Sequence, residues 1–135
     1  MRKFVSCFYG DLDIVRRTLT YTNAGHNPPF LLRRNGECLR LEDGGLVIGG
    51  FTDSAYTQRE IQLNEGDKLV LFTDGVTEAR NDSGEEFGEH RLEECLRSYR
   101  GRDAAELRTI ILDGVTRFCG DNFDDDAALM VMIAE

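Results

Sequence analysis

A continuous apolar run from Leu69 to Phe72 constrains the fold of this chain more than any other feature of its sequence. The run does not alternate with polar residues, and a turn-forming segment, residues 65–67, precedes it. Both properties are typical of a strand that is covered on both faces. Asp74 and Gly75 follow where this strand should end, and we expect a sharp glycine turn there. The turn is either without chemistry or delivers a catalytic or metal-binding carboxylate, since glycine lets the backbone or a ligand come close.

The end of the chain repeats this arrangement in reverse order. Residues 127–134 are a second uniformly apolar run, which predicts a second buried strand, and Asp124, Asp125 and Asp126 come directly before it. If the two strands are antiparallel neighbours, their acids meet at one end of the sheet. Clustered carboxylates raise one another's pKa unless a cation lies between them, and oxygen ligands favour Mg²⁺ or Mn²⁺. The alternative is a solvated acidic turn, because three adjacent side chains cannot all converge on one point.

The remaining pattern predicts several short strands followed by two helices. Asn35-Gly36 is a strong hairpin signal, and Asp103 is the expected N-cap of a helix that ends before Gly120. The glycine-rich segment 44–50 lacks the residue order of a dinucleotide loop or a P-loop, so we interpret it as a close-packed connection under the sheet. This order indicates an α+β fold, with mostly antiparallel sheets and the helices grouped on one face. The expected strands are residues 4–12, 17–22, 30–33, 37–41 and 56–63, and the expected helices are residues 90–99 and 104–119.

Composition narrows the class of protein further. The 135 residues suit a single domain, and the net charge of −9 disfavours nucleic acid or an anionic membrane as a partner. No apolar run approaches the roughly 20 residues of a membrane span. The four cysteines are widely spaced without a Cys-x-x-Cys pair, which favours reduced thiols and a cytoplasmic protein.

Five motifs in this chain resemble one known family. Residues 68–81 and the Gly-Glu-Glu-Phe-Gly of residues 84–88 are similar to the SpoIIE-type branch of the metal-dependent serine/threonine phosphatases, the type 2C-like (PPM) bacterial enzymes. The resemblance continues through residues 21–29, 45–49 and 125–131, in family order, and therefore spans nearly the whole chain.

The resemblance implies a fold, a reaction and a site. The implied fold is an α-β-β-α sandwich of antiparallel sheets, and the implied reaction is hydrolysis of phosphoserine or phosphothreonine on a protein by water activated at a Mn²⁺ or Mg²⁺ site. The implied substrate is a phosphorylated regulatory protein such as an anti-sigma-factor antagonist in bacterial signal transduction. Asp74 and Asp125 match the catalytic metal ligands, Gly75 and Asp126 complete the implied metal position, and Ala128 stands where the family motif has threonine.

The chain departs from the family pattern at its beginning. The early motif, an aspartate followed by Ser-Gly-His-Gly, is absent, and so are the helices that follow it and cover one sheet. The chain therefore resembles the C-terminal two-thirds of the domain, an incomplete sandwich. His26 lies in a turn motif and His90 opens a surface helix, so we interpret both as structural. We expect weak metal binding, negligible phosphatase activity of this chain alone, and an apolar sheet face covered by a homodimer or by strand exchange.

Two other interpretations remain open from the sequence. One is a non-catalytic, phosphatase-derived module that binds a regulator through its exposed sheet. The other is a carboxylate-rich metal protein of a different class.

Overall fold

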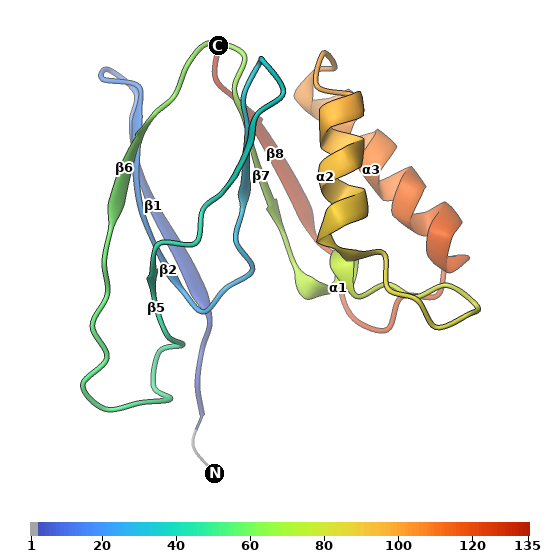
Figure 1. Ribbon diagram of the computed structural model, residues 1–135, viewed down its shortest axis with the longest axis horizontal. Helices are drawn as coiled ribbons and strands as arrows, with labels where there is room; N and C mark the ends of the chain where they lie inside the picture. Colours follow the sequence, from blue (N-terminus) through green and yellow to red (C-terminus); the bar gives the residue numbers. More distant parts are fainter. Residues whose placement is uncertain (1–2) are drawn as a thin grey trace. The chain divides into compact units, whose positions relative to one another are not determined.

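The structure is a computed structural model that describes residues 3–135, and these residues form two compact units. The first unit comprises residues up to Pro28 and 40–64, and the second comprises Pro29–Leu39 and Glu65–Glu135. Each contains an antiparallel hairpin or ladder, so the predicted α+β class with antiparallel sheets is confirmed (Figure 1). The elements are β1 (Cys7–Asp13), β2 (Thr18–Ala24), β3 (Phe30–Leu32), β4 (Cys38–Arg40), β5 (Gly44–Gly45), β6 (Arg59–Gln62), β7 (Lys68–Phe72), α1 (Asp74–Thr77), α2 (Gly88–Ser98), α3 (Ala104–Cys119) and β8 (Leu129–Ile133).

The first unit is built on the hairpin of β1 and β2. The Asp13 carboxylate closes its turn by accepting hydrogen bonds from the backbone N–H groups of Val15 and Arg16, at 3.0 and 2.8 Å. β6 pairs antiparallel with the other edge of β2, and β5 pairs parallel with its end. The buried Tyr21 hydroxyl donates to Asp43, and burial together with this bond raises the pKa of Tyr21 to about 12. A buried, hydrogen-bonded strand therefore organises this sheet.

The glycine-rich segment is the close-packed connection that its composition predicts. A Cβ atom on Gly44 would lie 1.8 Å from the carbonyl oxygen of Asn23 on β2, and one on Gly25 would lie 2.5 Å from the Val47 side chain. The backbone contact excludes a side chain at position 44, and a side chain at position 25 would require Val47 to shift. Glycine here permits backbones to touch, which is one of its established uses.

The second unit contains a four-stranded sheet in the order β4-β3-β7-β8. The Asn35-Gly36 hairpin between β3 and β4 forms as predicted: Gly36 has a φ of 93°, and Arg33 N–H donates to the Glu37 carbonyl at 2.7 Å. The buried β7 lies between β3 and β8 and pairs antiparallel with both. The two apolar runs of the sequence are therefore neighbours in one sheet.

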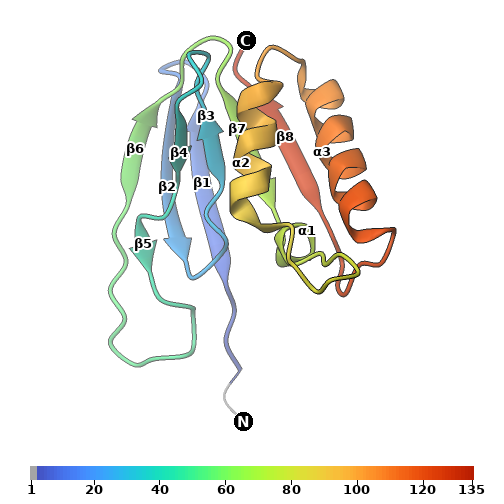
Figure 2. The ribbon, with the colours of Figure 1, turned by 45° about the vertical axis from the view of Figure 1, so that its right-hand side comes forward.

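Both long helices lie along this sheet, as Figure 2 shows for α2 and α3. α3 begins at the predicted N-cap, Asp103, whose carboxylate accepts from Glu106 N–H at 2.8 Å, and ends before Gly120, whose φ is 64°. α2 begins at Gly88, two residues before the expected start, which is an ordinary uncertainty of helix ends. The apolar faces of the helices and sheet form one core, made of Phe30, Leu32, Val70, Phe72, Val76, Ala79, Phe87, Leu92, Leu96, Leu107, Ile111, Val115 and Cys119.

The prediction that the last strand is buried on both faces is wrong. β8 is an edge strand of its sheet: Leu129 and Val131 pack against the core, whereas Met130 and Met132 are 58% and 42% exposed. The physical reason is that helices cover only the face of β8 that carries Leu129 and Val131. A uniformly apolar strand can be buried on both faces. Its sequence does not show whether other elements pack on both of them.

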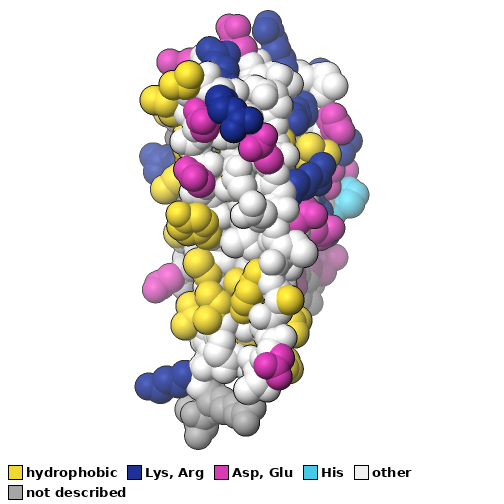
Figure 3. Space-filling view, turned by 90° about the vertical axis from the view of Figure 1, so that its left-hand side faces the viewer, with side chains coloured by type: hydrophobic (Ala, Val, Ile, Leu, Met, Phe, Trp, Pro, Cys, Tyr) yellow, Lys and Arg dark blue, Asp and Glu magenta, His cyan; other side chains and the backbone are white. Residues whose placement is uncertain are grey.

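The first unit exposes a group of apolar side chains, which we call the apolar surface: Phe4, Val5, Tyr9, Leu46, Ile48, Phe51 and Tyr56. Hydrophobic side chains gather on the face of this unit shown in Figure 3. The middle of the β1–β2 hairpin is more polar, because Asp11 pairs with Thr20 and Tyr9 pairs with Thr22. The expected apolar sheet face is therefore present in part. Among residues 3–135, no helix has both the length and the apolar character needed to cross a membrane.

Candidate metal and catalytic site

Asp74 lies at the end of β7, as predicted, but the turn that follows is helical. Thr73 is the N-cap, with φ −98° and ψ 164°, and Asp74 opens the short helix α1. Gly75 is buried in that helix and does not have a positive φ. The expected sharp glycine turn is therefore wrong, because the chain leaves the strand through an ordinary helix start.

Thr73 joins the end of β7 to the segment that leads into β8. Its backbone N–H donates to the Ala128 carbonyl at 3.1 Å, and its hydroxyl accepts from Ala128 N–H at 2.9 Å. The same hydroxyl donates to the Asp126 carbonyl at 3.2 Å. These three bonds hold the two acidic segments of the sequence against each other. The two acidic segments therefore lie at the same end of the sheet, as expected if the two strands are antiparallel neighbours.

Gly75 is required by contact rather than by its backbone angle. A Cβ atom at this position would lie 2.2 Å from the Asp126 carbonyl oxygen and 2.6 Å from its carbon. Real Cβ atoms do not approach a backbone this closely. The acidic segment before β8 therefore rests directly on the first turn of α1.

The carboxylates share this end of the sheet without converging on one point. Asp74, Asp125 and Asp126 are all exposed, and an Asp125 oxygen accepts from Asp126 N–H at 2.7 Å. The charge of Asp124 acts on Arg80: a hydrogen bond to Glu86 raises the pKa of Arg80 most, and the charges of Asp124 and Glu78 add to it. Among residues 3–135, no three His, Cys, Asp or Glu side chains are grouped so that they could hold a metal ion.

The residues present fit a divalent cation in the chemistry of their donors. Asp74 and Asp125 offer exposed carboxylate oxygens, and the Asp126 carbonyl oxygen lies against Gly75 of α1. Oxygen donors of this kind suit Mg²⁺ and Mn²⁺, and Mg²⁺ commonly keeps several waters beside one or two carboxylates. The donors are of the kind that a small hard cation prefers, although no three acidic side chains of residues 3–135 are placed for one ion.

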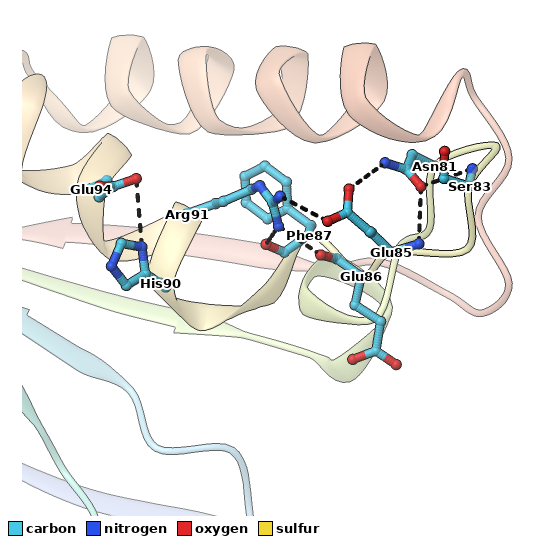
Figure 4. Close-up of polar contacts among 8 residues, drawn as sticks. All are labelled: Asn81, Ser83, Glu85, Glu86, Phe87, His90, Arg91 and Glu94. Atoms are coloured by element: carbon cyan, nitrogen blue, oxygen red, sulfur yellow. Dashed lines mark hydrogen bonds and ion pairs between the residues drawn. The ribbon is translucent and has the colours of Figure 1, made fainter.

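The segment between α1 and α2 forms a hydrogen-bonded support beside this site, drawn in Figure 4. The Asn81 side-chain oxygen accepts from the N–H groups of Ser83 and Glu85, and Arg91 donates to the Phe87 carbonyl at 3.2 Å. The Phe87 ring is buried and meets Phe118 of α3 edge to face. The Gly-Glu-Glu-Phe-Gly motif therefore anchors the connection to both helices.

Sequence reasoning missed the charged members of this support. Arg80 pairs with Glu86 at 3.0 Å, and Arg91 lies 4.7 Å from the centre of the Phe118 ring. The loop is irregular, so no periodic spacing pairs residues 80 and 86. Only the folded chain brings them together.

Neither histidine contributes to the acidic site in the described structure. The His26 ring nitrogen Nδ1 lies 2.9 Å from the Asn27 carbonyl, and His26 N–H donates to the Asn23 side chain within the same turn. His90 lies at the start of α2, 3.5 Å from Glu94 (Figure 4). Both contacts agree with the structural interpretation of the two residues.

Comparison with known proteins identifies the family. The family model described as stage II sporulation protein E (SpoIIE) matches residues 1–134. The chain therefore belongs to the SpoIIE family.

Individual relatives agree with this assignment. The chain is 33% identical over 131 residues to the phosphoserine phosphatase RsbU of Bacillus subtilis, covering 96% of this chain and 38% of RsbU. The fold is similar to that of the SiaA-PP2C domain of Pseudomonas aeruginosa, with a TM-score of 0.84, 21% identity, and coverage of 98% of this chain and 53% of that one. It is also similar to the Mn-presoaked phosphatase domain of SpoIIE from Bacillus subtilis, with a TM-score of 0.72, 18% identity, and coverage of 95% and 56%. The chain thus spans little more than half of these solved structures.

Proposed function

We propose that this chain carries the site of a metal-dependent protein serine/threonine phosphatase of the RsbU and SpoIIE kind. The observation that supports the proposal best is the junction of Thr73, Gly75 and Asp126, which brings both acidic motifs of the family to one end of the sheet. Membership of the SpoIIE family and the similarity to the phosphoserine phosphatase RsbU support the same reaction. The expected substrate is a phosphoserine- or phosphothreonine-bearing regulatory protein of a bacterial sigma-factor pathway.

In this proposal Asp74 and Asp125 are the catalytic metal ligands. Gly75 contributes backbone atoms to the metal position, and Asp126 completes this position from the segment before β8. The ion is Mn²⁺ or Mg²⁺, and the Mn-presoaked SpoIIE structure supports this choice. A bound divalent cation supplies Lewis-acid polarisation of a phosphoryl oxygen and a more acidic water. The protein supplies oxygen donors held in place by the Thr73 hydrogen bonds.

We further propose that the 135-residue chain by itself binds metal weakly and turns over a phosphoprotein negligibly. The reason is the number of donors, since residues 3–135 contain no group of three acidic side chains placed for one ion. The same observation, with the exposed apolar surface of the first unit, favours a second candidate function. In that alternative the chain is a non-catalytic module that binds a regulatory partner.

Titration with Mn²⁺, followed by nuclear magnetic resonance, tests the metal site at the affinity that the structure supports. We expect paramagnetic broadening first at the amides of Asp74, Gly75 and Asp126, and only at millimolar Mn²⁺. Asp74→Asn removes one ligand and should abolish the local broadening. Asp113→Asn changes an exposed aspartate of α3 in the same way and should leave it intact.

Two outcomes would contradict the proposal in different ways. Broadening elsewhere, or broadening that survives Asp74→Asn, would contradict the proposed metal site and favour the non-catalytic binding module. Micromolar Mn²⁺ affinity, or turnover of a phosphopeptide that Asp125→Asn abolishes, would show that the site is sufficient in this chain.

A further inference from the structure

A second polar site lies at the beginning of β7, whereas Asp74 follows its end. Here a pocket of about 470 Å³ opens between the β3–β4 hairpin, the start of β7 and the connection from α2 to α3. Its walls include the side chains of Arg34, Lys68, Arg100, Arg102, Asp103 and Ile133, all within the second unit. The volume is within the range of small-molecule sites in proteins.

The lining of this pocket is basic although the chain carries a net charge of −9. Among the residues that line the pocket, Arg34, Lys68, Arg100 and Arg102 are cationic and only Asp103 is acidic. The Asp103 carboxylate already caps α3, where it accepts from the Glu106 N–H at 2.8 Å. Arg102 also lies 3.9 Å from the Glu106 carboxylate, next to the pocket. Four cationic side chains therefore lie beside two carboxylates, those of Asp103 and Glu106, so the local charge remains positive. A local positive potential attracts anions whatever the net charge of the chain.

Two of the arginine side chains at the pocket, those of Arg34 and Arg100, pack against glycine turns. The Cδ atom of Arg34 would lie 3.3 Å from a Cβ on Gly66, and Arg100 would lie 3.6 Å from one on Gly36. Both glycines have positive φ, of 86° and 93°. Each arginine side chain thus packs on a turn at a glycine, where no side chain stands in its way. The Arg100 guanidinium donates to the Arg97 carbonyl at 2.9 Å, and this acceptor carries no charge.

Lys68 links the start of β7 to the connection between α2 and α3. The residue is 5% exposed, and its ammonium donates to the Arg100 carbonyl at 2.6 Å. Burial lowers the pKa of Lys68, and the charge of Asp67 opposes this shift. Asp67 is itself engaged by Arg33. Lys68 therefore fixes the α2–α3 connection over the start of β7.

We propose that this pocket binds a phosphate-bearing anion, either inorganic phosphate or the phosphate group of a small metabolite. Guanidinium groups form paired, charge-assisted hydrogen bonds with phosphate oxygens, and an ammonium group adds a point charge. The site is separate from the acidic junction, since Lys68 begins β7 and Asp74 follows its end. The inference does not depend on the proposed phosphatase function.

Titration of the whole chain with inorganic phosphate, pyrophosphate and AMP tests this site by amide chemical shifts. The buffer contains a chelator and low salt, so that no cation can bridge phosphate to the acidic end. We expect shifts at Gly36, Gly66 and Gly101. Tighter binding of the inorganic ions than of AMP identifies a free oxyanion as the ligand, and the reverse identifies a phosphorylated metabolite.

Charge-removing variants decide whether the pocket is responsible. Arg34→Gln and Arg100→Gln should each weaken phosphate binding about tenfold, the loss of one charge-assisted hydrogen bond. Both residues are exposed, so the fold should persist, and circular dichroism checks this. Arg108→Gln removes an exposed arginine of α3 outside the pocket and should change nothing. The proposal is overturned if no ligand shifts these glycines at millimolar concentration, or if the three variants bind alike.

Discussion

Gly75 shows how a single residue decides the geometry of the acidic junction. The Asp-Gly pair predicts a turn, yet the glycine is helical and buried. Its missing side chain instead makes room for the Asp126 carbonyl, 2.2 Å from where a Cβ would stand. The requirement comes from a residue that is distant in sequence, so the local pattern could not reveal it.

Gly75→Ala should therefore destabilise the chain although alanine favours helices. We expect a loss of about 1–3 kcal/mol in the free energy of unfolding, as for other overpacked sites, measured by urea denaturation. Gly114→Ala is the matched control: it also lies in a helix, but a Cβ there meets nothing within 4 Å. That variant should gain up to about 1 kcal/mol. Equal stability of Gly75→Ala and the parent chain would contradict the contact.

Ala128 is the second informative residue. The family resemblance places a threonine here, and its loss removes a hydroxyl beside the acids. The structure shows that position 128 joins the junction through its backbone, by bonds to Thr73 in both directions. The junction of the two acidic segments is therefore formed without that hydroxyl.

At the scale of elements, the pairing of β7 with β8 carries the site. The ladder runs from Lys68 opposite Ile133 to Phe72 opposite Leu129, and Thr73 extends it by three hydrogen bonds. The positions of the acidic residues therefore depend on the pairing of β7 with β8, and β8 is an edge strand of the sheet.

Thr73→Val should loosen the acidic end of this pair while the shape of the side chain is kept. The Ala128 N–H loses its acceptor and the Asp126 carbonyl loses its donor, which should cost about 1–3 kcal/mol. Hydrogen exchange at the Ala128 amide should accelerate correspondingly. Thr109→Val is a suitable control, because the Thr109 hydroxyl bonds only locally to the Ala105 carbonyl within α3. Unchanged protection of Ala128 would contradict the role of Thr73.

At the scale of the whole molecule, the apolar surface of the first unit needs a cover. Tyr9 and Phe51 are 65% and 60% exposed, and contiguous apolar surface of this kind commonly marks an interaction site. The proposal made from sequence is a second copy of the chain, as a homodimer or by strand exchange. The structure supplies the exposed apolar side chains that such an interface would cover.

Sedimentation velocity over a range of concentrations should therefore detect a dimer. Tyr9→Ser combined with Phe51→Ser removes apolar area and should shift the chain toward monomer. Tyr99→Ser alters a tyrosine of similar kind, 42% exposed after α2, and should have no such effect. A clean monomer of the parent chain at high concentration would count against self-association.

The sequence by itself determined the local features whose causes lie within a few residues. The N-cap at Asp103, the hairpin at Asn35-Gly36 and the strand from Lys68 to Phe72 all occur where turn and cap chemistry predicts them. The motif order also identified the family that the comparison confirms. The pairing of the two apolar runs was only a condition at the level of sequence, and the structure shows it.

Tertiary structure alone decided which surfaces are covered and which distant groups meet. It left β8 at a sheet edge, set Gly75 against Asp126, and gathered Arg34, Lys68 and Arg100 around one pocket. Burial and approach depend on what packs from elsewhere in the chain, and periodicity records only the preferences of one segment. The sequence could therefore indicate which segments form the acidic junction. It could not give the contacts between them or the limited number of metal donors.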